Sequence, residues 1–348
     1  MKTVLSYFIC LCCVLGTSYA QQNRVTFTKS QTDPVVHVYI NGKPFTDFLF
    51  PDTIAKPVLY PIKAPNGTNI TRGFPVNPIA GEPTDHPHHL GLWFNYGDVN
   101  GLDFWNNSFA VPSDKKHLYG NIKFGKIVSM KEGAVGSLSY VADWNNNDGR
   151  SLLKEKTSFR FTELQGHWVI DRTTRLTAVV PVFFKDNKEG LFGLRMAHEL
   201  QIPTTETRKF VDGQGVETTF KVVNDSIANG NYINSNGIQG ESVWGKRADW
   251  CMMYAKMNTD TISVLIIDHP NNVGYPTFWH ARGYGLFSAN PLGEKVFTGG
   301  ESERNLSLKP KESVTFRYRV VIASDKKKLS QDMIKLLEQD FASTVSIH

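Results

Sequence analysis

Strict alternation of apolar and polar side chains runs through Val314-Thr315-Phe316-Arg317-Tyr318-Arg319-Val320, and this period of two predicts a β-strand with one buried face. Residues 157–161 and 36–40 alternate in the same way, and Asn41-Gly42 supply a turn after the second of these segments. Residues 261–267 are more continuously apolar, which is typical of a strand covered on both faces. We therefore predict a protein built mainly from strands.

One helix is predicted, close to the C-terminus. Its apolar residues fall on a single helical stripe: Leu329, Met333, Ile334, Leu336, Leu337 and Phe341. Ser324 or Asp325 is the expected N-cap, and the stripe should pack on the outside of the sheets. A long series of strands with one late helix predicts an all-β fold, namely a large antiparallel β-sandwich with one C-terminal helix.

The composition is that of a globular protein. Of 348 residues, 41% are hydrophobic and 20% are charged, which excludes an intrinsically disordered chain. The formal charge of +5 comes from 38 basic and 33 acidic residues, and it is too small and too mixed to indicate a nucleic-acid partner. No linker, charge block or low-complexity segment divides residues 21–348, so we interpret them as a single domain.

Residues 1–20 resemble a signal peptide. Lys2 precedes an apolar run over residues 4–15, which is too short to span a membrane, and Ser18-Tyr19-Ala20 offers the small residues of a cleavage site. We therefore expect an exported protein, periplasmic or extracellular, and no later segment is long and apolar enough to be a membrane span.

Cleavage after Ala20 would remove Cys10, Cys12 and Cys13 and leave Cys251 alone. No internal disulfide is then expected, so stability must come from a buried core. Cys251 lies in Trp250-Cys251-Met252-Met253, which has the character of a core segment.

The densest polar segment extends from Asp85 to Trp105 and carries three histidines within four positions: His86, His88 and His89. In an extended strand His86 and His88 would share one face and His89 would take the other. Two imidazoles on one face can ligate a metal ion if a third ligand arrives from elsewhere. They can also act as acid–base or hydrogen-bonding groups on a sugar, or cap the start of a strand.

A second polar segment lies late in the chain, between residues 275 and 291. On a strand His280, Arg282 and Tyr284 would project in the same direction. An imidazole, a cation and a phenol in a row either face solvent or line a polar cleft, and the guanidinium fork suits hydroxyl pairs and carboxylates.

The carboxylates nearest the first segment are Asp98 and Asp103, and Glu241 precedes Arg247 further along the chain. A glycoside hydrolase needs two facing carboxylates, and the sequence identifies no such pair. Tryptophans that could either stack on a sugar or belong to the core are Trp93, Trp105, Trp244 and Trp279.

Several well-known motifs are absent from the sequence. It contains no dinucleotide-binding or phosphate-binding glycine motif, no paired Cys-x-x-Cys, and no motif of serine hydrolases or zinc proteases. We therefore expect no cofactor.

The two polar segments resemble a bacterial family named methane oxygenase PmoA. The similarity rests on the patterns in residues 85–105 and 279–291, and on Phe192-Gly193-Leu194-Arg195-Met196-Ala197. The family is similar to galactose mutarotase-like sandwiches, which implies a large antiparallel supersandwich and, by analogy, a carbohydrate role. Mutarotases carry a carboxylate base on a late strand, whereas the comparable strand here carries His280, Arg282 and Asn290, so simple mutarotase activity is not expected.

We expect a carbohydrate-active enzyme with a cleft on the concave face of the sandwich. His88 or His89 would act as acid or base, His280 and Arg282 would hold the substrate or a developing oxyanion, and Asp98 or Asp103 would orient an imidazole. The expected substrate contacts are Arg282, Tyr284, Trp93, Trp105, Glu241 and Asn290.

Two alternatives remain open. A non-catalytic glycan-binding protein would use the same cleft, and a metal-dependent enzyme would use His86 and His88 as ligands. A carbohydrate is the partner expected for the carbohydrate-active enzyme and for the glycan-binding protein. The sequence leaves the oligomeric state open.

Overall fold

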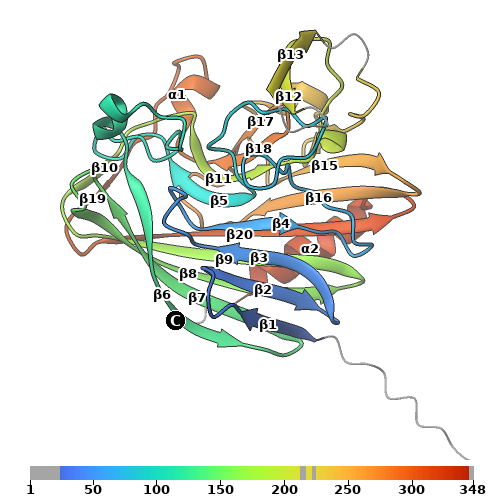
Figure 1. Ribbon diagram of the computed structural model, residues 1–348, viewed down its shortest axis with the longest axis horizontal. Coiled ribbons are helices and arrows are strands. Elements are labelled where there is room, and N and C mark those ends of the chain that lie inside the picture. Colours follow the sequence, from blue (N-terminus) through green and yellow to red (C-terminus); the bar gives the residue numbers. More distant parts are fainter. Residues whose placement is uncertain (1–23, 212–216, 222–224, 345–348) are drawn as a thin grey trace, which may run out of the picture.

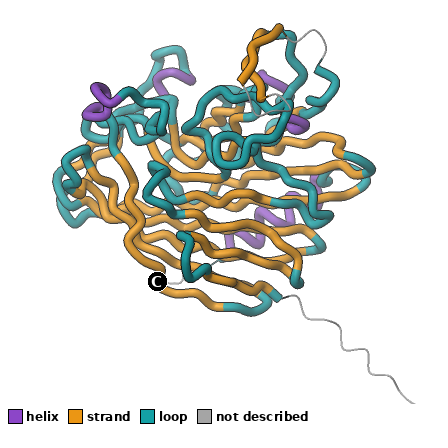
Figure 2. Tube along the Cα trace, viewed as in Figure 1, coloured by secondary structure: helices purple, strands orange, loops and turns teal. Residues whose placement is uncertain are grey.

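The computed structural model describes residues 24–344, apart from residues 212–216 and 222–224. These residues form two eight-stranded antiparallel sheets stacked face to face, with one long helix behind the second sheet (Figure 1). Figure 2 shows how far strands dominate the described chain and that loops gather along one side of the first sheet. The predicted large antiparallel β-sandwich with a C-terminal helix is confirmed.

The first sheet contains, in spatial order, β1 (Val25–Lys29), β2 (Val35–Ile40), β3 (Lys43–Leu49), β4 (Val58–Ile62), β5 (Leu92–Tyr96), β11 (Gly190–Arg195), β18 (Leu286–Asn290) and β17 (Phe278–Ala281). The first five of these strands follow one another in sequence. The last three come from much later in the chain and are added at the edge beside β5. The sheet therefore brings residues near 90, 190 and 280 next to one another.

The second sheet contains, in spatial order, β14 (Asn231–Asn234), β15 (Trp250–Met257), β16 (Asp260–Asp268), β20 (Ser313–Asp325), β9 (His167–Ala178), β8 (Ser151–Leu164), β7 (Val135–Asn145) and β6 (Asn121–Lys131). Two small ladders pair β10 (Val182–Phe184) with β19 (Leu306–Leu308) and β12 (Thr207–Val211) with β13 (Glu217–Lys221). The helical segments are α1 (Glu294–Phe297), α2 (Gln331–Ser343) and the 3-10 turns Ser113–Leu118, His198–Leu200 and Gly240–Val243.

The core lies between the two sheets and follows the alternation of the sequence. On β20, Phe316, Tyr318 and Val320 point into this core, while Val321 and Ala323 point outward into a second apolar cluster. The segments predicted as strands at residues 36–40, 157–161, 261–267 and 314–320 all lie within strands. Burial of apolar area, at roughly 25 cal/mol per Å², is the main stabilising contribution here.

Helix α2 covers the outer face of the second sheet, as predicted. Ile334, Leu337 and Phe341 pack there against the outward-facing residues of β16 and β20. The predicted N-cap is wrong, because β20 continues through Ser324 and Asp325, and Ser330 caps the helix by accepting the amide N–H of Met333 at 3.2 Å.

Cys251 is a buried free thiol on β15, as the core character of its segment predicted. The expected signal peptide, residues 1–20, lies outside the described residues. Among the helices that are described, none has the length and apolar character needed to cross a membrane.

Candidate functional site

The histidine segment is a turn that leads into β5, so the extended conformation in which His86 and His88 would share one face is not adopted. His86 has a positive φ of 48°, Pro87 follows, and the amide N–H of His89 donates to the carbonyl oxygen of His86 at 3.0 Å. Strand β5 begins only at Leu92. His86 and His88 therefore do not share a strand face, and His86 is exposed, His88 is half-buried and His89 is buried.

Strand register places Trp93 of the early polar segment and His280 of the late polar segment on the same face of the first sheet. Trp93 lies opposite Gly193, Gly193 lies opposite Ser288, and Ser288 lies opposite His280 across β5, β11, β18 and β17. Directly opposed residues of antiparallel strands share a face. Leu92, next to Trp93, points into the core between the sheets, so this row lies on the outer face.

Trp93 and Trp105 lie over Gly193 on this outer face. A Cβ atom at Gly193 would come within 2.5 Å of Cζ2 of Trp93 and within 3.0 Å of Cη2 of Trp105, so a glycine is required for both indoles to fit. Both tryptophans have 0% exposure, which corrects the expectation that they stack on a sugar. Their Nε1 atoms nevertheless have no hydrogen-bond partner among the described residues.

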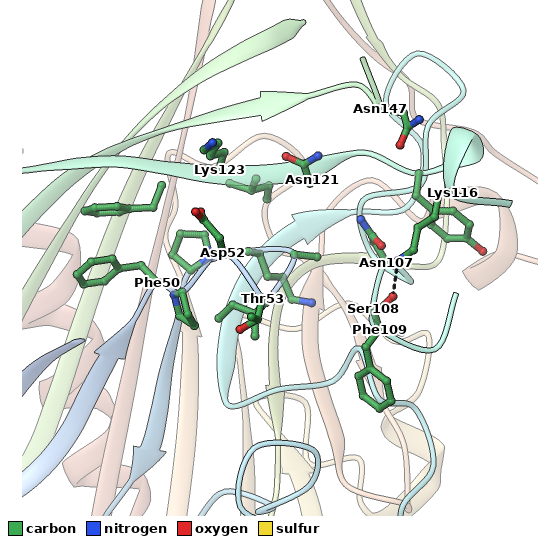
Figure 3. Close-up of a pocket in the computed structure, with 18 residues that line it drawn as sticks. Phe50, Asp52, Thr53, Asn107, Ser108, Phe109, Lys116, Asn121, Lys123 and Asn147 are labelled. Atoms are coloured by element: carbon green, nitrogen blue, oxygen red, sulfur yellow. Dashed lines mark hydrogen bonds between the residues drawn. The ribbon is translucent and has the colours of Figure 1, made fainter. Parts of the chain in front are cut away.

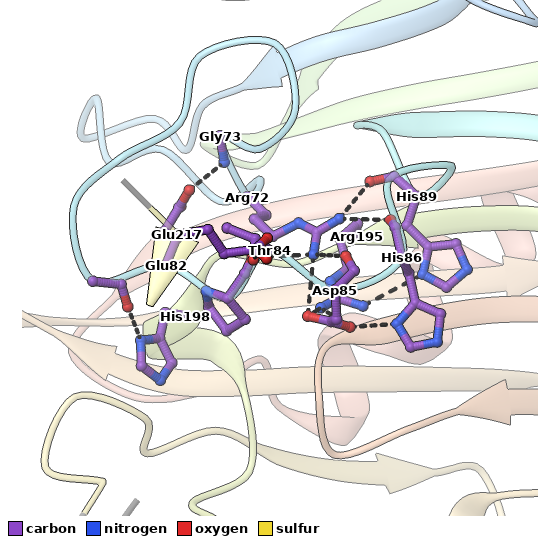
Figure 4. A network of polar contacts seen from close by, with 12 residues as sticks. Arg72, Gly73, Glu82, Thr84, Asp85, His86, His89, Arg195, His198 and Glu217 are labelled. Atoms are coloured by element: carbon purple, nitrogen blue, oxygen red, sulfur yellow. Dashed lines mark hydrogen bonds and ion pairs between the residues drawn. The ribbon is translucent and has the colours of Figure 1, made fainter. Parts of the chain in front are cut away.

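A buried ionic network holds the histidine turn against β11 (Figure 4). Asp85 accepts hydrogen bonds from Nη2 of Arg195 at 2.7 and 2.9 Å, and it also contacts Nη1 of Arg72 at 3.3 Å and Nδ1 of His86. The side chains of both arginines have 0% exposure. Burial alone would raise the pKa of Asp85, but the facing guanidinium groups and His86 lower it well below its usual value.

Arg72 also fixes the backbone of the turn. Its guanidinium donates to the carbonyl oxygens of Pro83, His86 and His89 at 3.2, 2.9 and 3.1 Å. Neither Arg72 nor Arg195 was assigned a role from the sequence. Arg195 stands in one of the motifs quoted above, whereas Arg72 stands in none of them.

The late polar segment reaches the histidine turn through Tyr284. Strand β17 ends at Ala281, and Arg282 to Gly285 form the turn into β18, so the expected row of His280, Arg282 and Tyr284 on one strand is wrong. The ring of Tyr284 lies parallel to that of His86, with centroids 4.9 Å apart, and the guanidinium of Arg195 lies 4.8 Å from the Tyr284 ring. The predicted meeting of the early and late segments is therefore observed at this contact.

Glu189 connects this contact to His280. Its Oε2 lies 3.9 Å from Nδ1 of His280, and its side chain, 21% exposed, also pairs with Lys188. The charge of Glu189 contributes to raising the pKa of both Tyr284 and Asp103. Glu189 thus lies among the other groups of the site, although the sequence offered no spacing that would single it out.

Asp103 and Lys56 close the site on the side of β4 and β5. Burial, with the charge of Glu189 as a further cause, raises the pKa of Asp103, against hydrogen bonds from Asn106 and Trp105. Lys56 is buried and donates to the carbonyl oxygen of His88 at 2.8 Å. Burial lowers the pKa of Lys56 to about 7, although Asp103 opposes the shift.

Three buried or half-buried histidines of the site, His88, His89 and His280, have lowered pKa values and are neutral at physiological pH. Burial and then nearby cations, Lys56 first, lower the pKa of His88 to about 2. Burial lowers the pKa of His280 to about 4, against the charge of Glu189. Burial also lowers the pKa of His89, whose Nδ1 lies 3.3 Å from Arg195, so its proton is on Nε2, which has no partner among the described residues. His88 and His89 were expected to act as acid or base, and in their neutral form they can accept a proton or a hydrogen bond.

Other predicted residues have structural positions. Asp98 lies beyond the far end of β5, where its Oδ1 accepts the amide N–H of Gly101, so it does not orient an imidazole. Asn290 is buried and donates to the carbonyl oxygens of Asn187 and Lys188. It was expected to contact the substrate, but these hydrogen bonds instead hold the backbone that precedes Glu189.

Arg282 and Glu241 lie at the margin of the site. Arg282 is exposed, and its guanidinium lies 5.1 Å from the ring of Trp244. Glu241 is exposed too, with its Oε1 next to Gly283, where a Cβ would approach it to 2.3 Å. Trp279, the remaining tryptophan considered, is fully buried in the core between the sheets.

We refer to the residues that meet here as the outer-face cluster: His86, His88, His89, Trp93, Asp103, Trp105, Glu189, His280 and Tyr284. Across the described ranges, no three His, Cys, Asp or Glu side chains are arranged to hold a metal ion. His86 and His88 were the metal candidates, and His86 instead contacts Asp85 through Nδ1.

Comparison with known protein families identifies a sequence family. The model of a family of unknown function, DUF6807, matches residues 35–336. The match is not to the family named methane oxygenase PmoA, so that expected resemblance gains no support. No curated protein sequence matches the chain significantly.

Two solved structures illustrate the structural similarity. GH36 alpha-galactosidase AgaA from Geobacillus stearothermophilus aligns with 11% identity and a TM-score of 0.37 over 86% of this chain and 41% of its own length. The Slr1438 protein from Synechocystis sp. PCC 6803 aligns with 9% identity and a TM-score of 0.36 over 86% of this chain and 96% of its own length. The chain therefore spans about two fifths of the galactosidase, and its chemistry has to be derived from its own site.

Proposed function

The chain belongs to DUF6807, a family of unknown function, and we propose that it is an exported carbohydrate-active enzyme whose substrate binds at the outer-face cluster. The observation that carries the proposal is a set of buried N–H donors without partners. These are Nε1 of Trp93, Nε1 of Trp105 and Nε2 of His89, all on one face of the sheet. A buried donor without a partner costs about 1–3 kcal/mol. Because Trp93 and Trp105 have 0% exposure, a polyhydroxylated ligand would supply the missing acceptors only after the side chains above the two indoles move.

The carboxyl groups of Asp103 and Glu189 are the proposed acid and base. Burial raises the pKa of Asp103, which is the direction that a general acid requires, although hydrogen bonds from Asn106 and Trp105 oppose the shift. Glu189 is partly exposed and next to neutral His280, so it can take up a proton or attack. Sugar hydrolysis and sugar isomerisation both use such a pair, and the neutral imidazoles would hold hydroxyl groups in place.

A second candidate is a non-catalytic glycan-binding protein. The low pKa values of His88 and His280 favour it, because neutral imidazoles suit hydrogen bonding better than proton transfer. Saturable sugar binding in calorimetry, with no product formed over long incubation, would support this candidate against the enzyme.

Export is proposed from the signal-like residues 1–20. The single cysteine of the remaining chain, Cys251, is buried and free, so folding would need no disulfide in the oxidising compartment.

The Glu189→Gln variant tests the enzymatic proposal. With a panel of glycans and glycosides, product formation is expected to fall by roughly 10²–10⁴-fold while binding is retained, because the carboxylate is lost but its shape is kept. Glu132→Gln, a surface glutamate paired with Arg24, is the matched control and should leave the rate unchanged. A Glu189→Gln protein that turns over substrate at the native rate would refute the assignment.

A further inference from the structure

A cavity of about 460 Å³ lies beside the outer-face cluster, between the β3–β4 loop and the start of β6 (Figure 3). Its walls come from residues 50–57, from the segment between Asn107 and Tyr119, and from Asn121 to Phe124. This volume falls in the range of roughly 300–1,000 Å³ that is typical of small-molecule sites. None of the outer-face cluster residues lines this cavity, and Lys56 lies between the two.

The cavity joins the outer-face cluster through one residue. Lys56 lines the cavity, and its Nζ donates to the carbonyl oxygen of His88 and lies 5.5 Å from the ring of Trp93. The two sites therefore share a wall. A chain of sugar units bound at the outer-face cluster could extend into the cavity.

The lining combines amides, hydroxyls and aromatic rings. Asn107, Asn121 and Asn147 contribute amides, and Thr53, Ser108 and Tyr119 contribute hydroxyl groups. Phe50 and Phe124 stack on each other with centroids 4.1 Å apart, and Phe109 is 67% exposed at the margin. Exposed aromatic faces beside amide groups are suited to the apolar and hydroxyl faces of a sugar ring.

The charge of the lining is predominantly positive. The lining residues include three lysines, Lys56, Lys116 and Lys123, and a single carboxylate, that of Asp52. Lys116 donates to the carbonyl oxygen of Ser108 at 2.8 Å. Lys123 is exposed and has no ion-pair partner in the described part of the chain, so its charge is available to a ligand.

We propose that this cavity is a subsite for an acidic sugar unit, one that carries a carboxylate or sulfate group, next to the outer-face cluster. The ligand class rests on the proposed carbohydrate function. Phe109 would stack on the sugar ring, the asparagines would bind its hydroxyl groups, and Lys123 with Lys116 would pair with the anionic group.

Calorimetry with three probes tests the subsite: trigalacturonic acid, a 6-sulfated galactotriose and neutral galactotriose. We expect at least one acidic probe to bind more tightly than the neutral one, and the tighter of the two identifies the anionic group. Lys123→Gln should weaken binding of that acidic probe by up to about fivefold and leave the neutral probe unaffected. Lys126→Gln removes the same charge from an exposed position on β6 outside the cavity and should change nothing.

Phe109→Ala should weaken all binding probes by up to about tenfold, whereas Phe183→Ala, at another exposed phenylalanine, should not. Equal affinity for acidic and neutral probes, or equal losses in Lys123→Gln and Lys126→Gln, would overturn the subsite. Glu189→Gln separates the two proposals, because it should lower turnover as stated above and leave the effect of Lys123→Gln on binding intact.

Discussion

Asp85 is the residue on which the geometry of the site depends most. It is the carboxylate that faces two guanidinium groups with no exposure, those of Arg72 and Arg195. Asp85→Asn leaves both cations without their counter-charge, and removing one partner of a buried ion pair costs about 3 kcal/mol or more. Urea denaturation of the two proteins would measure this loss.

Asp98→Asn is the matched control, because the Asp98 carboxylate accepts a hydrogen bond from the backbone N–H of Gly101 in a turn. It should change the free energy of unfolding by about 0.5 kcal/mol or less. If Asp85→Asn and Asp98→Asn were equally stable, the ionic network would not hold the site together.

The same network predicts a pH dependence. The native pKa of Asp85 is lowered below its unfolded value of about 3.9, so the unfolded chain binds more protons in acid. The stabilisation by Asp85 is therefore complete above about pH 4 and is lost as the pH falls below it. In urea titrations, the difference in free energy of unfolding between the native protein and Asp85→Asn should therefore shrink as the pH is lowered from 5 to 3, because the unfolded chain takes up the proton first. A difference that stays constant over that interval would contradict this assignment of charge.

At the scale of elements, the strands were predictable and the ends of several elements were not. Alternation located β20 and the apolar stripe located α2, but the helix N-cap was expected at Ser324 or Asp325. These two residues continue the ladder with β16, opposite Ile262 and Thr261. Pairing with a strand distant in sequence thus overrides a local capping signal.

Ser330→Ala tests the observed start of α2. The variant removes the hydrogen bond to the amide of Met333 and should lower the free energy of unfolding by about 1 kcal/mol. Ser324→Ala, at the end of β20, should change it by less than about 0.5 kcal/mol in the same thermal or urea experiment. The opposite order of these two losses would show that the helix begins earlier.

The histidine turn shows a second limit of local patterns. The spacing of His86 and His88 would fit a strand, but donors from Arg72 hold the carbonyl oxygens of His86 and His89 and close the segment into a turn. Arg72 pairs with this segment only after folding, so the sequence pattern could not show it. The sequence pointed to these histidines as candidate site residues, but it did not predict the conformation of the segment that carries them.

At the scale of the whole molecule, the fold brings the site together by an unpredictable strand order. β5, β11, β18 and β17 are neighbours although they begin at residues 92, 190, 286 and 278. The sequence indicated that two polar segments would meet, and Tyr284 on His86 confirms this contact. Glu189 was missed because a single carboxylate in a loop carries no periodic signal, and only the pairing of β11 with β5 places it in the site.

The central claim is that the outer face of the first sheet, around Glu189 and Tyr284, is where a saccharide binds. The most direct measurement is a crystal structure of the protein with the oligosaccharide that binds most tightly in solution. We predict a sugar unit in contact with the ring of His86 or Tyr284 and within reach of the Glu189 carboxylate. A saccharide bound only on the α2 side of the second sheet, with the outer-face cluster unchanged and unoccupied, would contradict the account.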